Sequence, residues 1–349
     1  MKAVIHIGPT KTGSTALSRY FHLANTRKKL PSNIIYPEGD LWFGQQKHSM
    51  LKFWQTVTDH EAENFGDFIP EVDQAFKNIV EHARVAGGED ATVVFISETL
   101  MTMPNPSTLT RPLSKYFSDI TFVMVARLQD EAIASGLTQM LKAKIDNQVT
   151  SLDVAEFMAN KSAVSRFDYA LQLDRWLPIA DEHKLVVLPY LSSSTNPHLV
   201  VTTFSAGLGH DVKLPRIPKF EQSRPNRSPT AQQLLEFVSL KRQYSRALVE
   251  NNVTVMANLT AQFKTLQNAS QSTEIHASAE GNAAEKPWRL PPRDAFIILS
   301  AFDGSNRRLL TYVEDSPLAG QWGRWQKNLE KRLAEGRALT KNSRYDADA

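Results

Sequence analysis

The residue types best suited to chemistry are concentrated near the N-terminus, in the run Lys11, Thr12, Gly13, Ser14 and Thr15. This run supplies a cation, three hydroxyl groups and the backbone N–H groups of a glycine-bearing loop. Such N–H groups, together with the positive end of a following helix, commonly bind a phosphate group. The run therefore predicts a site for a phosphate-like anion.

The flanking residues predict the elements that would position this loop. Ala3 to Ile7 is an apolar run rich in β-branched residues, which predicts a buried strand. Gly8-Pro9 ends that run, and a helical pattern opens at Ala16. Strand, glycine-bearing loop and helix therefore follow one another in the order that phosphate-binding loops use.

The loop differs from the P-loop of nucleoside triphosphate enzymes. Gly8 and Gly13 have the spacing of the pattern G-x-x-x-x-G-K-[ST], but Ser14 stands where that pattern has lysine. Lys11 lies within the loop instead, and no strand that ends in aspartate offers an evident magnesium partner. We therefore expect a phosphate-like ligand and no obligatory metal ion.

The run from Lys11 to Thr15 resembles the 5′-phosphosulfate loop of sulfotransferases that use 3′-phosphoadenosine-5′-phosphosulfate (PAPS). The pattern in that family is Lys-[Ser/Thr]-Gly-[Ser/Thr]-[Ser/Thr], placed after the first strand and opening the first helix. The resemblance implies that all five residues of the run bind the 5′ end of PAPS. It also implies that Lys11 stabilises charge on the leaving oxygen and that the nucleotide product is 3′-phosphoadenosine 5′-phosphate (PAP).

A second motif matches the other half of the family signature. Ile120 to Ala126 predicts a buried strand, Arg127 ends it, and Ser135 follows eight positions later on the next predicted helix. The resemblance implies that Arg127 pairs with the 3′-phosphate through its forked guanidinium and that Ser135 donates its hydroxyl to the same group. The family usually has proline two residues after the arginine, where this chain has Gln129.

Three residues are candidates for the general base. Glu98 follows the predicted strand at 92–96, and ligands of open α/β sheets bind beyond the carboxyl ends of strands. A carboxylate there can accept the proton of an acceptor hydroxyl. Glu38 and His48, in the loop after the short predicted strand at 34–37, are the alternatives. A helix-capping role for Glu98 and a solvated loop around Glu38 and His48 are the plainer interpretations.

The apolar runs and helical patterns alternate along the chain, which predicts an α/β fold with a parallel central sheet flanked by helices and a P-loop-like nucleotide-binding core. A further strand is predicted at 184–190, and helices at 68–86, 167–177 and 234–248. We expect a single domain over residues 1–349, with a flexible excursion in the polar stretch 267–287. Asn306 to Arg308 could approach the nucleotide, although surface arginines at a helix start are the simpler interpretation.

Composition narrows the function classes. The 349 residues carry a net charge of +3 and no dense basic block, which argues against a nucleic-acid partner. There is no cysteine for a disulfide or a thiolate metal site. The N-terminal apolar run is shorter than a signal-peptide core, and no stretch reaches the ~20 apolar residues of a membrane span. We expect a cytoplasmic protein that resembles the bacterial branch of the family.

These features together predict an enzyme, a sulfotransferase that moves the sulfuryl group of PAPS in line to a hydroxyl acceptor. The resemblance implies a carbohydrate or glycolipid acceptor, but the sequence does not identify it, nor does it indicate an oligomeric state. Two alternatives stay open at this point. One is a small-molecule kinase that uses ATP, and the other is a non-catalytic module that binds PAP.

Overall fold

The structure, a computed structural model, describes most of the chain in several ranges. They are residues 1–9, 11–37, 70–97, 100–146, 151–191, 198–209, 212–218, 220, 229–271, 288–316 and 318–345. The chain divides into two compact units. Unit 1 comprises Met1–Arg127, Ser165–Gln222 and Phe302–Asn328, and unit 2 comprises Leu128–Val164, Ser223–Ala301 and Leu329–Ala349. The expectation of a single domain stays a prediction.

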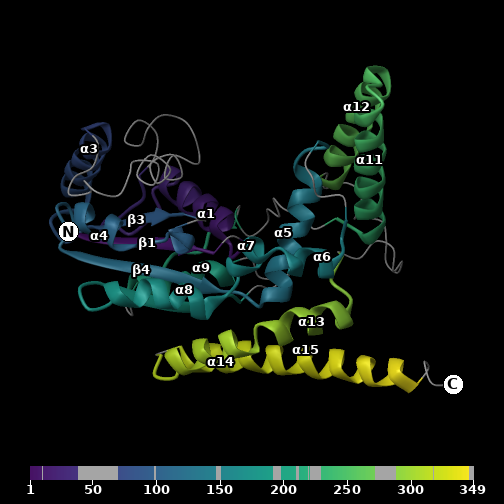
Figure 1. Ribbon diagram of the computed structural model, residues 1–349. Coiled ribbons are helices and arrows are strands. Elements are labelled where there is room, and N and C mark those ends of the chain that lie inside the picture. Colours follow the sequence, from purple (N-terminus) through teal and green to yellow (C-terminus); the bar gives the residue numbers. More distant parts are fainter. Residues whose placement is uncertain are drawn as a thin grey trace. The chain divides into compact units, whose positions relative to one another are not determined.

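Unit 1 is built on a five-stranded sheet in which every neighbouring pair of strands is parallel (Figure 1). The strand order is β2-β3-β1-β4-β5. The strands are β1 (Lys2–Gly8), β2 (Ile34–Ile35), β3 (Thr92–Ile96), β4 (Asp119–Ala126) and β5 (Lys184–Pro189). The predicted α/β fold with a parallel central sheet flanked by helices is confirmed.

The central strands read as nearly continuous apolar runs because helices cover both faces of the sheet. On one face, Val4 and Val94 pack in a cluster with residues of α1 (Ser14–Thr26) and α9 (Leu199–Leu208). Helix α9 lies so close to β4 that a Cβ atom at Gly207 would be 2.8 Å from Val123 Cγ2. The face that carries the loop after β1 is therefore tightly packed.

Successive side chains of a strand point to opposite faces, so Phe95 and Phe122 lie on the other face. Phe95 meets Phe76 of α3 (Pro70–Gly87) edge to face, and Phe122 packs on Trp176 of α8 (Tyr169–Trp176) with ring centroids 5.0 Å apart. The Trp176 indole N–H also donates to the Met101 carbonyl at 3.0 Å. This aromatic layer fixes the helices that flank the sheet.

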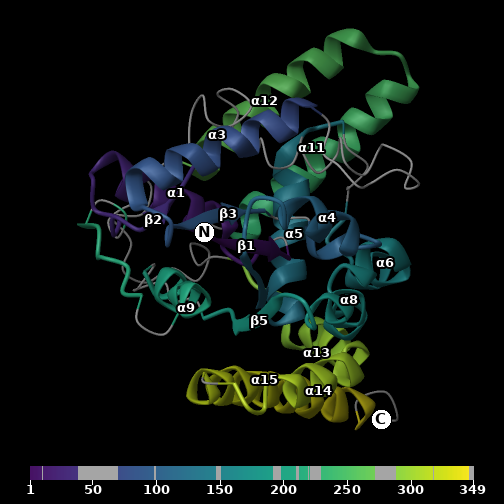
Figure 2. The same cartoon turned by 90° about the vertical axis from the view of Figure 1, so that its left-hand side faces the viewer.

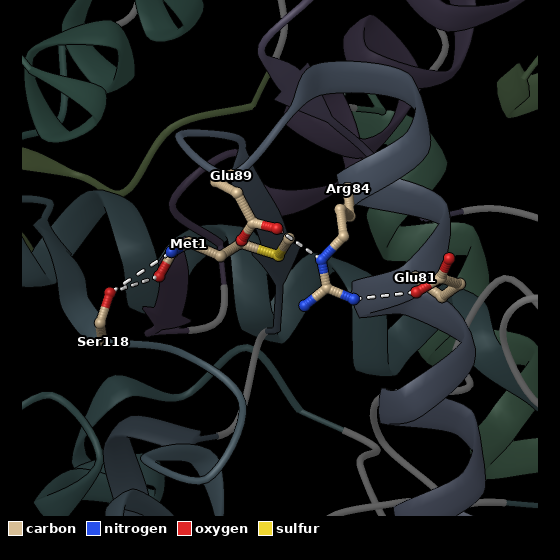
Figure 3. A network of polar contacts seen from close by, with 5 residues as sticks. All are labelled: Met1, Glu81, Arg84, Glu89 and Ser118. Carbon is tan, nitrogen blue, oxygen red and sulfur yellow. Dashed lines mark hydrogen bonds and ion pairs between the residues drawn. The ribbon is translucent and has the colours of Figure 1, made fainter.

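The amino ends of the strands are held by polar contacts, shown in Figure 3. The hydroxyl of Ser118, just before β4, donates to the Met1 carbonyl at 3.1 Å and accepts a hydrogen bond from the Met1 amino group at 3.3 Å. The Ser118 backbone N–H also donates to the Met1 carbonyl, at 3.1 Å. Arg84 near the end of α3 donates to Glu81 at 2.9 Å and to Glu89 at 2.7 Å. All three of these charged side chains are exposed, so the ion pairs contribute little to stability.

Unit 2 is helical in the part of the chain that the structure describes. Helices α11 (Ala231–Val249) and α12 (Val253–Gln271) form a hairpin, seen in green in Figure 2, that packs on α5 (Gln129–Ala143). A capping box between Thr230 and Gln233 begins α11. The predicted excursion at 267–287 starts inside α12, which continues to Gln271, and residues 272–287 lie outside the described residues.

The remaining elements are mostly short helices. They are η3 (Leu100–Thr102), α4 (Ser107–Leu113), α6 (Val154–Ala159), α7 (Lys161–Ser165), η4 (Leu177–Ile179), α13 (Pro292–Ala301), α14 (Asp303–Tyr312) and the long α15 (Ala319–Tyr345). None of the helices in the described ranges is long and apolar enough to cross a membrane.

Candidate functional site

The loop after β1 depends on glycine at its last position. Gly13 has φ = 96°, a left-handed conformation that residues with a Cβ atom rarely adopt, and α1 begins at the next residue. A Cβ atom at Gly13 would lie 2.8 Å from Val200 Cγ2 and 3.2 Å from Tyr190 Cε2. Both the backbone angle and the surrounding space therefore require glycine here.

The N-terminus of α1 suits an anion in the part of the chain that the structure describes. Its N-cap residue, Gly13, has no side chain to occupy the free N–H groups, and the first turn of α1 contains no acidic residue. A helix N-terminus concentrates N–H groups and partial positive charge, which favours a bound anion. The backbone of this loop therefore fits the phosphate-like ligand that the sequence predicts.

The hydroxyl residues of the run differ in their surroundings. Thr12 is fully buried, and its hydroxyl donates to the Pro9 carbonyl within the loop. Ser14 is also buried, whereas Thr15 is exposed. The Thr12 hydroxyl thus stabilises the loop's own backbone, and among the three hydroxyl residues it is Thr15 that is open to solvent. Thr10, between Pro9 and Lys11, lies outside the described residues.

Lys11 and Arg127 are brought together by the sheet. Arg127 follows the last residue of β4, and its Nη1 donates to the Lys11 carbonyl at 2.7 Å. Lys11 has φ = 69°, an unfavourable left-handed angle for a residue with a side chain. The hydrogen bond from Arg127 helps to hold this backbone conformation. Lys11 of the first motif and Arg127 of the second therefore meet at one place in unit 1.

Two tyrosines surround Arg127. The guanidinium carbon lies 4.8 Å from the centroid of the Tyr190 ring, which is a cation–π contact. Tyr169, fully buried at the start of α8, accepts a hydrogen bond from the Arg127 backbone N–H at 2.9 Å and donates its hydroxyl to the Arg127 carbonyl. The backbone and the side chain of Arg127 are thus both fixed by aromatic residues.

The strand order explains why these residues meet. Strands β1, β4 and β5 are neighbours and parallel, so their carboxyl ends lie along one edge of the sheet. The backbone N–H of Tyr190, which follows β5, donates to the Ala126 carbonyl at 2.7 Å. Lys11, Arg127 and Tyr190 each come after one of these three strands. Ligands of open α/β sheets bind beyond this edge.

The remaining predicted site residues stay predictions. Ser135 lies on α5 in unit 2 and is partly exposed. The candidate bases Glu38, His48 and Glu98 lie outside the described residues, so their assignment stays a prediction. Arg307 pairs with Asp303 at 2.8 Å and Arg308 with Asp174, so both late arginines make contacts within unit 1.

The buried residue just before Glu98 belongs to the core of the same edge. Ser97 follows β3, and its N–H donates to the His6 carbonyl at 2.9 Å. The Ser97 carbonyl lies 2.7 Å from His6 Nδ1, and His6 is fully buried in β1. These two hydrogen bonds hold the chain in place as far as Ser97, the residue before Glu98.

Among the described residues, no group of three or more histidine, aspartate and glutamate side chains is placed to hold a metal ion.

Tyr169 and Tyr190 were not predicted as site residues. Their only sequence signal is position, since Tyr190 is the last residue of the predicted strand at 184–190 and Tyr169 lies near the start of the helix predicted at 167–177. Comparison of the chain with protein-family models, with curated proteins and with solved structures found no match.

Proposed function

We propose that this protein is an enzyme, a sulfotransferase that transfers the sulfuryl group of PAPS to a hydroxyl acceptor. The hydrogen bond between Arg127 Nη1 and the Lys11 carbonyl is the observation that carries the proposal. It joins the two segments that resemble the 5′- and 3′-phosphate motifs of PAPS enzymes, although they are more than a hundred residues apart in sequence. A lone glycine-bearing turn or a lone arginine at a strand end would carry far less weight.

The donors in this part of unit 1 suit a nucleotide with phosphates at two positions. The loop from Lys11 to Thr15 and the N-terminus of α1 would hold the 5′ end. Arg127, a planar cation with several N–H donors, would hold the 3′-phosphate. The family resemblance implies a second donor to this group, the hydroxyl of Ser135, a residue of unit 2. When bound, PAPS supplies an activated sulfuryl group together with a phosphate leaving group.

The chain's own residues would then have two tasks in the transfer. The Lys11 ammonium stabilises negative charge that grows on the leaving oxygen, which is electrostatic catalysis by a fixed donor. Glu98, or else His48 or Glu38, accepts the proton of the attacking hydroxyl. The proposed acceptor is a carbohydrate or glycolipid hydroxyl. A cytoplasmic location, suggested by the resemblance to the bacterial branch, belongs to the same proposal and is testable by cell fractionation.

Calorimetric titration with PAP, ADP and ATP tests the proposal at the nucleotide, with ATP measured both with and without Mg²⁺. PAP and ADP share the adenosine and the 5′-phosphate, but only PAP carries a 3′-phosphate. We expect PAP to bind most tightly and Mg²⁺ to make little difference. Equal affinities for PAP and ADP would overturn the sulfotransferase proposal, and preferential binding of ATP with Mg²⁺ would support a kinase instead.

A further inference from the structure

We infer that Tyr190 is the positioning residue that holds Arg127 in place for the 3′-phosphate before the nucleotide binds. The inference rests on the proposed function and adds a residue that neither sequence motif contains. Three observations carry it: the cation–π contact, the space at Gly13 and the backbone contact between β5 and β4.

The Tyr190 ring contacts both halves of the proposed nucleotide site. On one side the Arg127 guanidinium carbon is 4.8 Å from the ring centroid. On another side, Cε2 of the same ring is 3.2 Å from the position that a Cβ atom of Gly13 would take. The absence of a side chain at Gly13 therefore makes room for the ring that supports Arg127. The glycine of the first motif and the arginine of the second share one aromatic neighbour.

The backbone fixes where this ring can lie. The N–H of Tyr190 donates to the carbonyl of Ala126, the residue just before Arg127, at 2.7 Å. Tyr190 and Arg127 are thus held at adjacent strand ends by a main-chain bond, while Tyr169 holds the Arg127 backbone from α8. The Tyr190 ring and the Lys11 carbonyl both contact the guanidinium group and restrict the rotation of this long side chain.

A restricted arginine binds an anion at a lower entropic cost than a mobile one. A long side chain that becomes immobile on binding reduces the affinity, and a contact that orders it beforehand removes that penalty. Nucleotides without a 3′-phosphate gain nothing from this order. Loss of the Tyr190 ring should therefore weaken the binding of PAP but not of ADP.

The test measures the ratio of the ADP and PAP dissociation constants for wild type, Tyr190→Leu and Tyr190→Phe, each alone and in an Arg127→Ala background. We expect Tyr190→Leu to lower the ratio about five-fold, the typical scale of a cation–π contact, with ADP binding unchanged. Tyr190→Phe keeps the ring and should keep the ratio. In the Arg127→Ala background neither substitution should change the ratio, because the group that Tyr190 positions is gone.

Each other outcome overturns the inference in a recognisable way. If Tyr190→Leu keeps the ratio while Arg127→Ala loses it, Tyr190 does not position the arginine and the proposed function stands. If Tyr190→Leu lowers the ratio equally in both backgrounds, or weakens ADP and PAP alike, the residue acts through the loop or the fold. If wild type does not distinguish PAP from ADP, the proposed function falls and this role falls with it. Should Tyr190→Leu fail to fold, Tyr190→Met offers the same comparison with an unbranched side chain.

Discussion

At the scale of single residues, the loop after β1 requires glycine at position 13, because of both its backbone angle and the space around it. Gly13→Ala would place a Cβ atom 2.8 Å from Val200 Cγ2 in a left-handed backbone conformation. We expect it to lower the free energy of unfolding by about 1–3 kcal/mol, measured by urea denaturation. Gly304→Ala is the matched control, because Gly304 is helical and has no neighbour within 4 Å of an added Cβ atom. Equal effects of the two substitutions would contradict this interpretation.

The proposed catalytic residues should act in the transition state more than in binding. Lys11→Ala and Glu98→Gln should each bind PAP within a few-fold of wild type, while kcat falls about 10²-fold or more. Transfer of sulfate from PAPS to a panel of sugar hydroxyls measures kcat, and calorimetry measures PAP binding. If Glu98→Gln stays active while His48→Ala or Glu38→Gln is inactive, the base belongs to the 38–48 loop. Full activity of all these variants would refute the assignment of the base altogether.

At the scale of elements, the pairing of α5 with α15 contains a buried carboxylate. Asp130 is 1% exposed and forms an ion pair with Arg332, which also contacts Glu131 at 2.8 Å. Burial raises the pKa of Asp130 to about 6, against the pull of Arg332, and the nearby Glu131 charge acts in the same direction as burial. All three residues lie in unit 2.

This raised pKa predicts a pH dependence of stability. The folded state holds the Asp130 proton more tightly than the unfolded state, so the stabilising contribution is complete below the ordinary aspartate pKa. It is lost as the pH rises through about 6. The loss is about 2 kcal/mol between pH 4 and pH 7, for a shift of roughly two pKa units.

Urea denaturation at several pH values from 4 to 7 gives the free energy of unfolding of wild type and of each variant. In Asp130→Asn this free energy should fall less steeply with rising pH than in wild type. Glu156→Gln, which removes an exposed carboxylate of the same unit, should keep the wild-type slope. Identical slopes in wild type and Asp130→Asn would show that Asp130 titrates alike in the folded and unfolded states.

At the scale of the whole molecule, the sequence was most informative where structure is local. The apolar runs at 92–96 and 120–126 became β3 and β4, because a strand buried on both faces must be apolar throughout. The loop residues and Arg127 are predicted as site residues from short local patterns, and this assignment stays a prediction. What depended on long-range packing was not foreseen. Tyr169 and Tyr190 reach Arg127 only through the strand order and the placement of α8, and no spacing in the sequence encodes these.

The division into two units also depends on long-range packing and could not be predicted from the sequence. Unit 2 is assembled from three separate stretches of the chain, so no single change in composition marks its boundaries. The polar stretch 267–287 was predicted as an excursion from composition alone. Its first residues are nevertheless helical, because α12 continues to Gln271 and packs against α11. Propensity is a weak guide where tertiary contacts decide.

The central claim is that the loop after β1 and Arg127 form one site for a nucleotide with a 3′-phosphate. Its most direct test compares the dissociation constants of PAP and ADP in wild type, in Arg127→Ala and in Arg84→Ala, a control that removes an exposed arginine from α3. We predict that wild type and Arg84→Ala prefer PAP, and that Arg127→Ala loses most of the preference, about 1.5–3 kcal/mol for a charged hydrogen-bonding partner. Equal binding of PAP and ADP by wild type, or an undiminished preference in Arg127→Ala, would contradict the claim.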